Sequence, residues 1–495
     1  MHWKTFDNLG PSQIDFVLTT TFYTDTSIPL MAPAALKPVI EKAGLSCLAI
    51  DINAEMIEYV KQHKFSDSFV RFFFEEKLNK EIEQEIFDIF DSVTDKLISY
   101  NPKYIGLSVF SFLCQASTKW LCYFITKKRP DIKILIGGPG CLPKFTGTSK
   151  FVKLLQQNNL IDYHIRGDAE HSLYQLLIGN DEYEGINSAT WKNLKNSDLE
   201  KIPTPDYSNY KFELYTLPAL PIVGSRGCVR QCTFCDYITN WKKFQWRTAD
   251  HVFEEMLAQY KRYNIRFFKF QDSLVNGNMK ESTRLLELIA DYNDHHPEEK
   301  FSWAGFWIFR ERSSRSEREW ELVAKSGAIL LAVGIESFSQ RVRYSMGKKF
   351  SDESIIFHYE QALKWKVICQ NLIIVGYINE TQEDIDIAKQ WLRDNLRFKD
   401  VIRFCWGSGL AIFDDTYLGE NKDALGIKMI GPNPHEWIST QIPSTPEQRR
   451  QWSIELRELS YQLGWQVEEN DHDNHFLLEK SLYKKYESMS DTDIS

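Results

Sequence analysis

The sequence contains no apolar run long enough to cross a membrane as a helix. Its longest apolar stretches, residues 329–335 and 367–378, are too short or too interrupted to supply the ~20 apolar residues that a span requires. The opening residues MHWKTFD also lack the apolar core of a secretory signal. We therefore expect a soluble, cytoplasmic protein with no membrane partner.

The chain also carries fewer positive than negative side chains. The chain has 59 lysines and arginines against 68 aspartates and glutamates, which gives a formal net charge of −9. This balance argues against a broad nucleic-acid-binding surface, because such a surface needs clustered positive charge. The sequence has no low-complexity tract and no internal repeat. Its 495 residues, 43% of them hydrophobic, are enough for two or three globular domains.

Nine cysteines are present, and only three of them lie close together in the sequence. Cys228, Cys232 and Cys235 form the pattern C-x3-C-x2-C directly after an apolar, strand-like run at 220–223. A loop this short can turn three thiolates toward one point. Three thiolates on a four-iron cluster leave one iron free for another ligand. The six remaining cysteines sit mostly among apolar neighbours and are interpreted as buried, reduced thiols.

The alternative for the three clustered cysteines is a zinc site, which is common in intracellular proteins. A zinc site of this kind would need a fourth ligand. The next histidine, His251, lies well downstream on a predicted helix. The cysteine spacing alone leaves both interpretations open.

The N-terminal part of the chain alternates strand-like and helix-like patterns. This alternation predicts an α/β fold with a parallel, doubly wound (Rossmann-like) sheet, which binds ligands at the carboxyl ends of its strands. The predicted strands are 14–20, 45–52, 104–110, 132–136 and 162–165, with helices predicted at 32–43 and 115–128.

A second series of strands and helices follows the clustered cysteines. Six strands with intervening helices predict a partial (β/α)6 barrel, whose site belongs at the carboxyl ends of its strands. The predicted strands are 220–223, 265–270, 301–309, 329–335, 372–375 and 401–406. The predicted domains are therefore residues 1–207, 208–415 and a C-terminal segment, 416–495, of unknown role.

The cysteine spacing, Gly227 before the first cysteine and Phe234 before the third resemble the radical S-adenosylmethionine (SAM) superfamily. The resemblance implies that Cys228, Cys232 and Cys235 hold a 4Fe–4S cluster whose open iron chelates SAM, with Phe234 helping to position it. It also implies that an electron from the cluster splits SAM into methionine and a 5'-deoxyadenosyl radical.

Three further segments extend this resemblance, each at a predicted strand end. FQDSLVNGN is similar to the family's F-x-D-D-x-F-x-x-N, which implies that Asp272 binds the SAM amino group. ESFSQRV is similar to E-S-G-S-Q-R-V, which implies that Glu336 and Ser337 meet the ribose and methionine of SAM. Phe338 replaces the family glycine there and is expected to tighten the pocket. The turn at Gly376 is similar to G-x-P-G-E-T, whose backbone contacts adenine.

The order of pieces in the first domain resembles the cobalamin-binding domain upstream of many radical SAM domains. This resemblance implies that Ser108, Gly137 and Gly138 line the nucleotide tail of cobalamin, since small residues let the backbone come close. Many cobalamin proteins have a D-x-H-x-x-G loop after an early strand, and none occurs there in this chain. The same letters occur at 162–167, where His164 is predicted to be an ordinary strand residue. Cobalamin would then bind with no protein imidazole on its cobalt.

Together the resemblances imply a cobalamin-dependent radical SAM enzyme that methylates an unactivated carbon. A cyclase, an oxidase or a ring-rearranging enzyme would use the same machinery, and a zinc-stabilised binding protein is the alternative from another class. tRNA methylthiolation would need a second cluster and usually a basic RNA-binding module, and neither is apparent. The implied cofactors are the 4Fe–4S cluster, SAM and cobalamin. The implied partners are an unidentified substrate and an electron donor such as a flavodoxin or ferredoxin.

Overall fold

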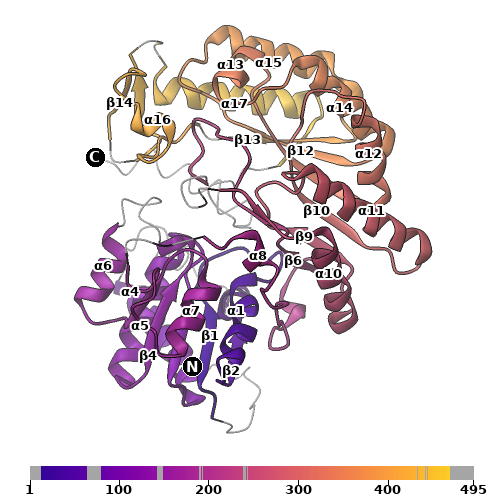
Figure 1. Ribbon diagram of the computed structural model, residues 1–495. Coiled ribbons are helices and arrows are strands. Elements are labelled where there is room, and N and C mark those ends of the chain that lie inside the picture. Colours follow the sequence, from indigo (N-terminus) through magenta and orange to yellow (C-terminus); the bar gives the residue numbers. More distant parts are fainter. Residues whose placement is uncertain are drawn as a thin grey trace. The chain divides into compact units, whose positions relative to one another are not determined.

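The computed structural model describes residues 13–63, 80–141, 149–188, 191, 193–237, 241, 243–407, 409–431, 433–440, 442 and 444–468. The chain divides into two compact units (Figure 1). Unit 1 comprises Met1–Leu194, Lys201–Pro218 and Asn474–Ser495, and unit 2 comprises Lys195–Glu200 and Ala219–Asp473.

Unit 1 is built on a five-stranded parallel sheet in the order β2-β1-β3-β4-β5. This confirms the predicted doubly wound α/β fold. The order reverses between β1 and β3, and ligands of such sheets bind at this switch point, beyond the carboxyl ends of the strands. The strands are β1 (Phe16–Thr20), β2 (Cys47–Ile50), β3 (Tyr104–Ser108), β4 (Lys133–Gly137) and β5 (Tyr163–Ile165).

Helices cover both faces of this sheet because successive strand residues point to opposite sides. Phe16 and Leu18 of β1 belong to a core with α1 (Met31–Lys42) and α7 (Ala169–Leu177). Val17 belongs to a larger core on the other face. The helices that contribute to that second core are α2 (Ile52–His63), α4 (Lys80–Ser99), α5 (Cys114–Lys128) and α6 (Ser149–Gln157).

Unit 2 is built on a seven-stranded parallel sheet in the order β6-β9-β10-β11-β12-β13-β16. The first six strands are the predicted barrel strands, so the predicted partial barrel is confirmed. The seventh, β16 (Gln466–Glu468), comes from the C-terminal segment and pairs with β13. The other strands are β6 (Ala219–Ile222), β9 (Phe267–Phe270), β10 (Ser302–Trp307), β11 (Ala328–Glu336), β12 (Ile368–Ile373) and β13 (Ile402–Trp406).

The long helices of unit 2 pack on the outer face of the sheet, as Figure 1 shows. Trp303 of β10 donates to Ser326, which follows α12, and Trp406 of β13 donates to Ser460 of α17. Several of these helices begin at a side-chain cap, Thr248 for α10 and Asn278 for α11 among them. The helices are α10 (Ala249–Tyr263), α11 (Met279–His295), α12 (Ser316–Lys325), α14 (Asp352–Trp365), α15 (Gln382–Asp394) and α17 (Pro446–Gln462).

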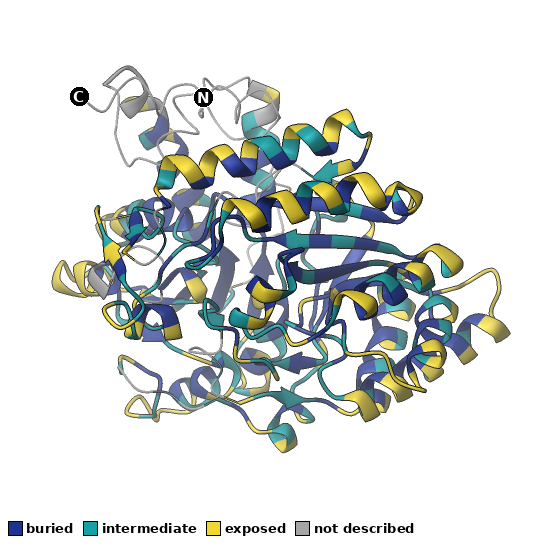
Figure 2. Ribbon diagram, turned by 90° about the horizontal axis from the view of Figure 1, so that it is seen from above, coloured by how far each residue is buried: buried dark blue, intermediate teal, exposed yellow. Residues whose placement is uncertain are grey.

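Smaller elements complete unit 2. The antiparallel pair β7 (Ser225–Arg226) and β8 (Gln245–Trp246) closes the cysteine loop at its base, and β14 (Ile427–Met429) pairs with β15 (Trp437–Ser439). The strands are mostly buried, whereas the long helices expose one side (Figure 2). None of the described helices combines the length and the apolar character needed to span a membrane.

Candidate active site

The loop that contains the three cysteines begins with a glycine that no other residue could replace without strain. Gly227 has φ +83°, and a Cβ there would lie 2.5 Å from the carbonyl oxygen of Lys243. The Ser273 hydroxyl donates to the Gly227 carbonyl. The backbone of Gly227, which precedes the first cysteine, is therefore fixed by its close approach to Lys243 and by its hydrogen bond from Ser273.

Asp272 fixes the N-terminal end of the same loop. Its carboxylate accepts hydrogen bonds from the Gly224 N–H at 2.9 Å and from the Ser225 hydroxyl at 2.5 Å. Burial raises the pKa of Asp272 to about 6, although these hydrogen bonds and the charge of Arg247 lower it. The structure thus directs this predicted SAM ligand, which is only 2% exposed, toward the cysteine loop.

The middle of the loop is held by segments far downstream. The Thr233 N–H donates to the carbonyl oxygen of Met346 at 3.2 Å, and the Thr233 hydroxyl lies 2.7 Å from that of Tyr377. The Leu418 N–H, in α16 (Tyr417–Glu420), donates to the Thr233 carbonyl at 3.1 Å. Phe234 packs against an apolar cluster that includes Met346, Tyr377 and Leu418. The C-terminal segment therefore contacts the cysteine loop directly.

The charge of Cys232 affects the pKa of the Cys235 thiol, and the charge of Cys228 affects the pKa of both. Burial raises the pKa of both thiols, that of Cys235 to about 12, and the charges of the neighbouring cysteines raise each further. The positive charge of Lys348 opposes this shift at Cys232.

Among the residues that the structure describes, no three thiol, imidazole or carboxylate groups are close enough to share one metal ion. Thiolates on a four-iron cluster bind three different irons and so stand farther apart than the ligands of one zinc ion.

Glu336 forms a buried ion pair with Lys348. Its carboxylate lies 2.9 Å from the Lys348 Nζ, and the two side chains are only 10% and 13% exposed. Burial alone would lower the pKa of Lys348, but the charges of Glu336 and Cys232 outweigh it and raise this pKa. The sequence alone gives Lys348 no role. Only the fold brings it to Glu336 and the cysteines.

The backbone at Glu336 is unusual and explains where its side chain points. Glu336 has φ +65°, and the pairing of β11 with β12 shifts register between Gly334 and Glu336. The side chain turns back over Gly334, where a Cβ would lie 2.4 Å from the Glu336 Oε1 and 2.6 Å from the Lys348 Nζ. A non-glycine residue in this conformation stores strain, which proteins commonly tolerate at functional sites.

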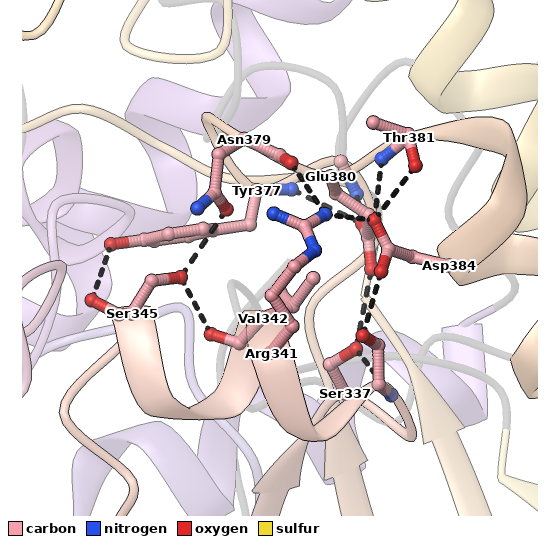
Figure 3. Close-up of polar contacts among 11 residues, drawn as sticks. Ser337, Arg341, Val342, Ser345, Tyr377, Asn379, Glu380, Thr381 and Asp384 are labelled. Carbon is pink, nitrogen blue, oxygen red and sulfur yellow. Dashed lines mark hydrogen bonds and ion pairs between the residues drawn. The ribbon is translucent and has the colours of Figure 1, made fainter.

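The segments that carry Ser337 and Gly376 are joined by a second buried carboxylate (Figure 3). Glu380 accepts hydrogen bonds from the Gly376 N–H at 2.5 Å, the Tyr377 N–H at 3.2 Å and the Ser337 hydroxyl at 3.3 Å. Burial raises the pKa of Glu380 to about 7 despite these donors.

A further carboxylate, Asp384, joins the same two segments. It accepts from Thr381, Ser339 and Arg341. Burial would raise the pKa of Asp384, but these hydrogen bonds lower it overall. Glu380 and Asp384 thus lock the turn after β12 to the turn after β11.

The position of Phe338 differs from what the sequence suggested, and Gly376 has a packing reason to be glycine. Phe338, expected to tighten the pocket, points instead to the helix layer, where it stacks on Trp391 at 4.2 Å and is 3% exposed. Gly376 has φ +83°, and a Cβ there would lie 2.2 Å from Arg449 of α17. Packing against Arg449 is therefore sufficient to require glycine at this position.

In unit 1, Ser108, Gly137 and Gly138 lie together at the carboxyl ends of β3 and β4. The Ser108 carbonyl accepts the N–H of Thr21, the residue after β1, so Ser108 lies at the switch point. Ser108 and Gly137 are half-buried and Gly138 is exposed. A Cβ on Gly138 would lie 2.6 Å from the Val109 carbonyl oxygen, which explains this glycine by backbone packing.

His164 lies on β5, as predicted, and is buried. Burial, followed by the charge of Arg166, lowers the pKa of this imidazole to about 4. Its ring is therefore neutral at physiological pH.

Residues 222–392 match the model of the radical SAM superfamily. This range contains all three clustered cysteines, Asp272, Glu336 and Gly376. These residues therefore form a radical SAM domain within the chain. The radical SAM domain begins at the last residue of β6 and ends within α15.

Three related proteins are named as methyltransferases, and a fourth is named as an anaerobic magnesium-protoporphyrin IX monomethyl ester cyclase. The chain is 24% identical over 324 residues to an uncharacterized methyltransferase of Pyrococcus horikoshii, covering 60% of this chain and 65% of that protein. It is 25% identical over 274 residues to the bacteriochlorophyllide d C-12(1)-methyltransferase of Chlorobaculum tepidum, covering 53% and 56%. The chain thus spans less than two thirds of the length of either relative.

Two solved structures share the fold over most of the chain. One is the radical SAM methyltransferase TsrM from Kitasatospora setae with tryptophan and a SAM analogue bound, with a TM-score of 0.61, 15% identity and coverage of 89% of this chain and 83% of that one. The other is the cobalamin-dependent radical SAM enzyme OxsB with aqua-cobalamin bound, with a TM-score of 0.63, 15% identity and coverage of 97% and 72%. At 15% identity, these two similarities show that the fold is shared and no more.

Proposed function

We propose that this radical SAM protein is a cobalamin-dependent methyltransferase that acts on an unactivated carbon. The observation that carries the proposal is the convergence of the cysteine loop and the Glu336–Lys348 ion pair within the segment that matches the radical SAM superfamily. Named relatives that methylate, and a shared fold with two radical SAM enzymes described with cobalamin or SAM-type ligands, support the choice of reaction.

Cys228, Cys232 and Cys235 are the proposed ligands of a 4Fe–4S cluster. When bound, such a cluster supplies the electron that cleaves SAM to methionine and a 5'-deoxyadenosyl radical. The protein's part is to present three thiolates. Lys348 favours the thiolate form of Cys232 by its charge, and Asp272, Thr233 and Leu418 hold the loop in place.

Glu336, Ser337, Gly376 and Phe234 remain the proposed SAM contacts. SAM carries a carboxylate, an amino group and a ribose, and the Glu336–Lys348 pair offers one acceptor and one donor for such groups. Asp272, whose two hydrogen bonds hold the start of the cysteine loop, is proposed to contribute to SAM binding through that loop.

Ser108, Gly137 and Gly138 are the proposed contacts of the cobalamin nucleotide tail. They lie at the carboxyl edge and switch point of the unit 1 sheet, which is where doubly wound sheets bind ligands. Bound cobalamin would supply the methyl group. A flavodoxin or ferredoxin is the proposed electron donor, because radical SAM enzymes need a one-electron reductant.

The test is anaerobic purification followed by analysis of iron, sulfide and bound corrinoid, and then incubation with SAM and dithionite. We expect equal iron and sulfide, and formation of methionine and 5'-deoxyadenosine. Cys232→Ala should abolish cleavage, whereas Cys369→Ala, a buried cysteine outside the loop, should retain it. Zinc without sulfide, or cleavage by Cys232→Ala, would refute the proposal.

A further inference from the structure

The two faces of the unit 2 sheet differ in how far their side chains are buried. On β12, Cys369 and Asn371 are fully buried, whereas the alternating residues Gln370 and Leu372 are half-buried. On β13, Phe404 is fully buried and contacts Trp391 of the helix layer. Successive strand residues point to opposite sides, so the more accessible residues form the inner face.

The inner face continues across the neighbouring strands. Register pairs Phe306 with Ala332, Ala332 with Gln370, and Gln370 with Arg403. Phe306 is 38% exposed, although it lies in a strand whose other side chains are mostly buried. This row combines an accessible aromatic ring, an amide and a guanidinium, which is unlike the apolar filling of a closed barrel.

The guanidinium of Arg403 has N–H donors that are not used in hydrogen bonds among the described residues. One of its terminal nitrogens donates to Glu468 of β16 at 3.2 Å, and its Nε is buried with no hydrogen-bond partner among the described residues. A guanidinium has five N–H donors arranged to match a carboxylate or phosphate. A buried donor without an acceptor is costly, so this position is suited to an incoming anion.

The predicted SAM contacts lie near this row. The Glu336–Lys348 pair lies over Gly334, which belongs to the inner face. Gly334 pairs with Leu372 and Leu372 with Cys405, two residues beyond Arg403. With strands ~4.8 Å apart and a rise of ~3.3 Å per residue, the Cα atoms of Arg403 and Gly334 are about 12 Å apart. A small substrate can span this distance.

We propose that the substrate carries an anionic oxygen group, a carboxylate or a phosphate, which Arg403 and Gln370 bind, while Phe306 and Leu372 contact its apolar part. This inference rests on the proposed function for its reaction, but the binding site can be tested separately. Glu468 competes with the ligand for the guanidinium and limits its affinity.

The test uses the full-length protein and three matched probes, 4-phenylbutyrate, 4-phenylbutanol and inorganic phosphate, followed by saturation-transfer NMR and competition. We expect 4-phenylbutyrate to bind more tightly than 4-phenylbutanol. Arg403→Gln should weaken its binding about tenfold or more, the effect of losing one charge-assisted hydrogen bond. Displacement by phosphate would indicate a phosphate-bearing substrate, and its absence a carboxylate.

Glu468→Gln separates binding from a merely structural ion pair. If Arg403 only anchors β16, the Arg403→Gln and Glu468→Gln variants should affect the protein in the same way. If Arg403 binds the anion, Glu468→Gln should strengthen 4-phenylbutyrate binding while Arg403→Gln weakens it. Arg397→Gln, an exposed arginine 3.8 Å from Glu360, is the matched control and should change nothing.

Equal affinity for the acid and the alcohol, no acid binding, or an unchanged Arg403→Gln variant would overturn the inference. Iron content and SAM cleavage are measured on the same samples. A protein without iron that still binds the acid through Arg403 would refute the proposed function and leave the anion site standing. Normal SAM cleavage by a protein that does not bind 4-phenylbutyrate would support the proposed function and refute the anion site.

Discussion

Replacing Lys348 with methionine should destabilise unit 2 strongly, because it leaves the buried carboxylate of Glu336 without its partner. The Lys348 Nζ lies 2.9 Å from Glu336 and also donates to the Gly334 carbonyl at 3.2 Å. At an effective dielectric constant of about 20, the gross attraction across this pair is about 6 kcal/mol. Removing one member of a buried pair typically costs about 3–5 kcal/mol.

The double variant Glu336→Gln/Lys348→Met should recover most of that loss. With both charges gone, no ion remains buried, and such replacements are often close to neutral. We expect the double variant to lie within about 1 kcal/mol of the wild type, and the coupling between the two sites to be at least about 2 kcal/mol.

The assay is urea unfolding of the four proteins without cluster under reducing conditions. Tryptophan fluorescence reports on unit 2, where Trp303, Trp320 and Trp406 are fully buried. The exposed pair of Arg318 and Glu321, at 2.9 Å, provides a control cycle that should show a coupling of at most about 1 kcal/mol. Additive effects of Glu336→Gln and Lys348→Met would refute the reasoning, because they would show that the two charges do not interact.

Three further predictions follow from contacts described above. The raised pKa of Asp272 means that the folded state binds a proton more tightly than the unfolded state between pH ~4 and ~6. As the pH rises through this window, Asp272 therefore lowers the free energy of unfolding of unit 2 by about 3 kcal/mol. Asp272→Asn should remove this component when urea midpoints are compared at pH 4 and 7, and parallel profiles would contradict it. Ser108→Trp should abolish corrinoid retention, measured by absorbance, with iron content unchanged; normal retention would show that the nucleotide tail binds elsewhere. Leu418→Pro should lower iron content more than Leu418→Ala, because only proline removes the N–H that donates to Thr233; equal iron content in the two variants would exclude a role for that hydrogen bond.

The sequence was sufficient to predict the five strands of the unit 1 sheet, the first six strands of the unit 2 sheet, and the polar segments at their carboxyl ends. Alternation of apolar runs with helical patterns is a local signal, and the ends of β6, β9 and β11 follow from it. The strand predicted at 372–375 begins earlier, at Ile368, because Gln370 and Asn371 interrupt the apolar pattern. The short strand β16 was missed for a similar reason, since its three residues have no pattern of their own.

The directions of side chains beyond a strand end could not be predicted. The register shift between Gly334 and Glu336 breaks the alternation that would otherwise assign faces, so the outward direction of Phe338 is invisible in the sequence. The contacts of Asp272 with Gly224, and of Gly376 with Arg449, join segments far apart in the chain. Such contacts depend on the tertiary fold and leave no local pattern.

The hydrogen bonds from distant segments to Thr233 have a consequence for when the cluster can be inserted during synthesis. As the chain leaves the ribosome, the three thiols emerge long before Tyr377 and Leu418, which supply the hydroxyl and N–H that hold their loop. In a nascent chain that lacks Tyr377 and Leu418, the cysteine loop would not have the hydrogen bonds that hold it in the folded protein. Cluster loading is therefore expected to follow translation, and fragments that stop short of α16 should be poor recipients for the cell's iron–sulfur delivery machinery.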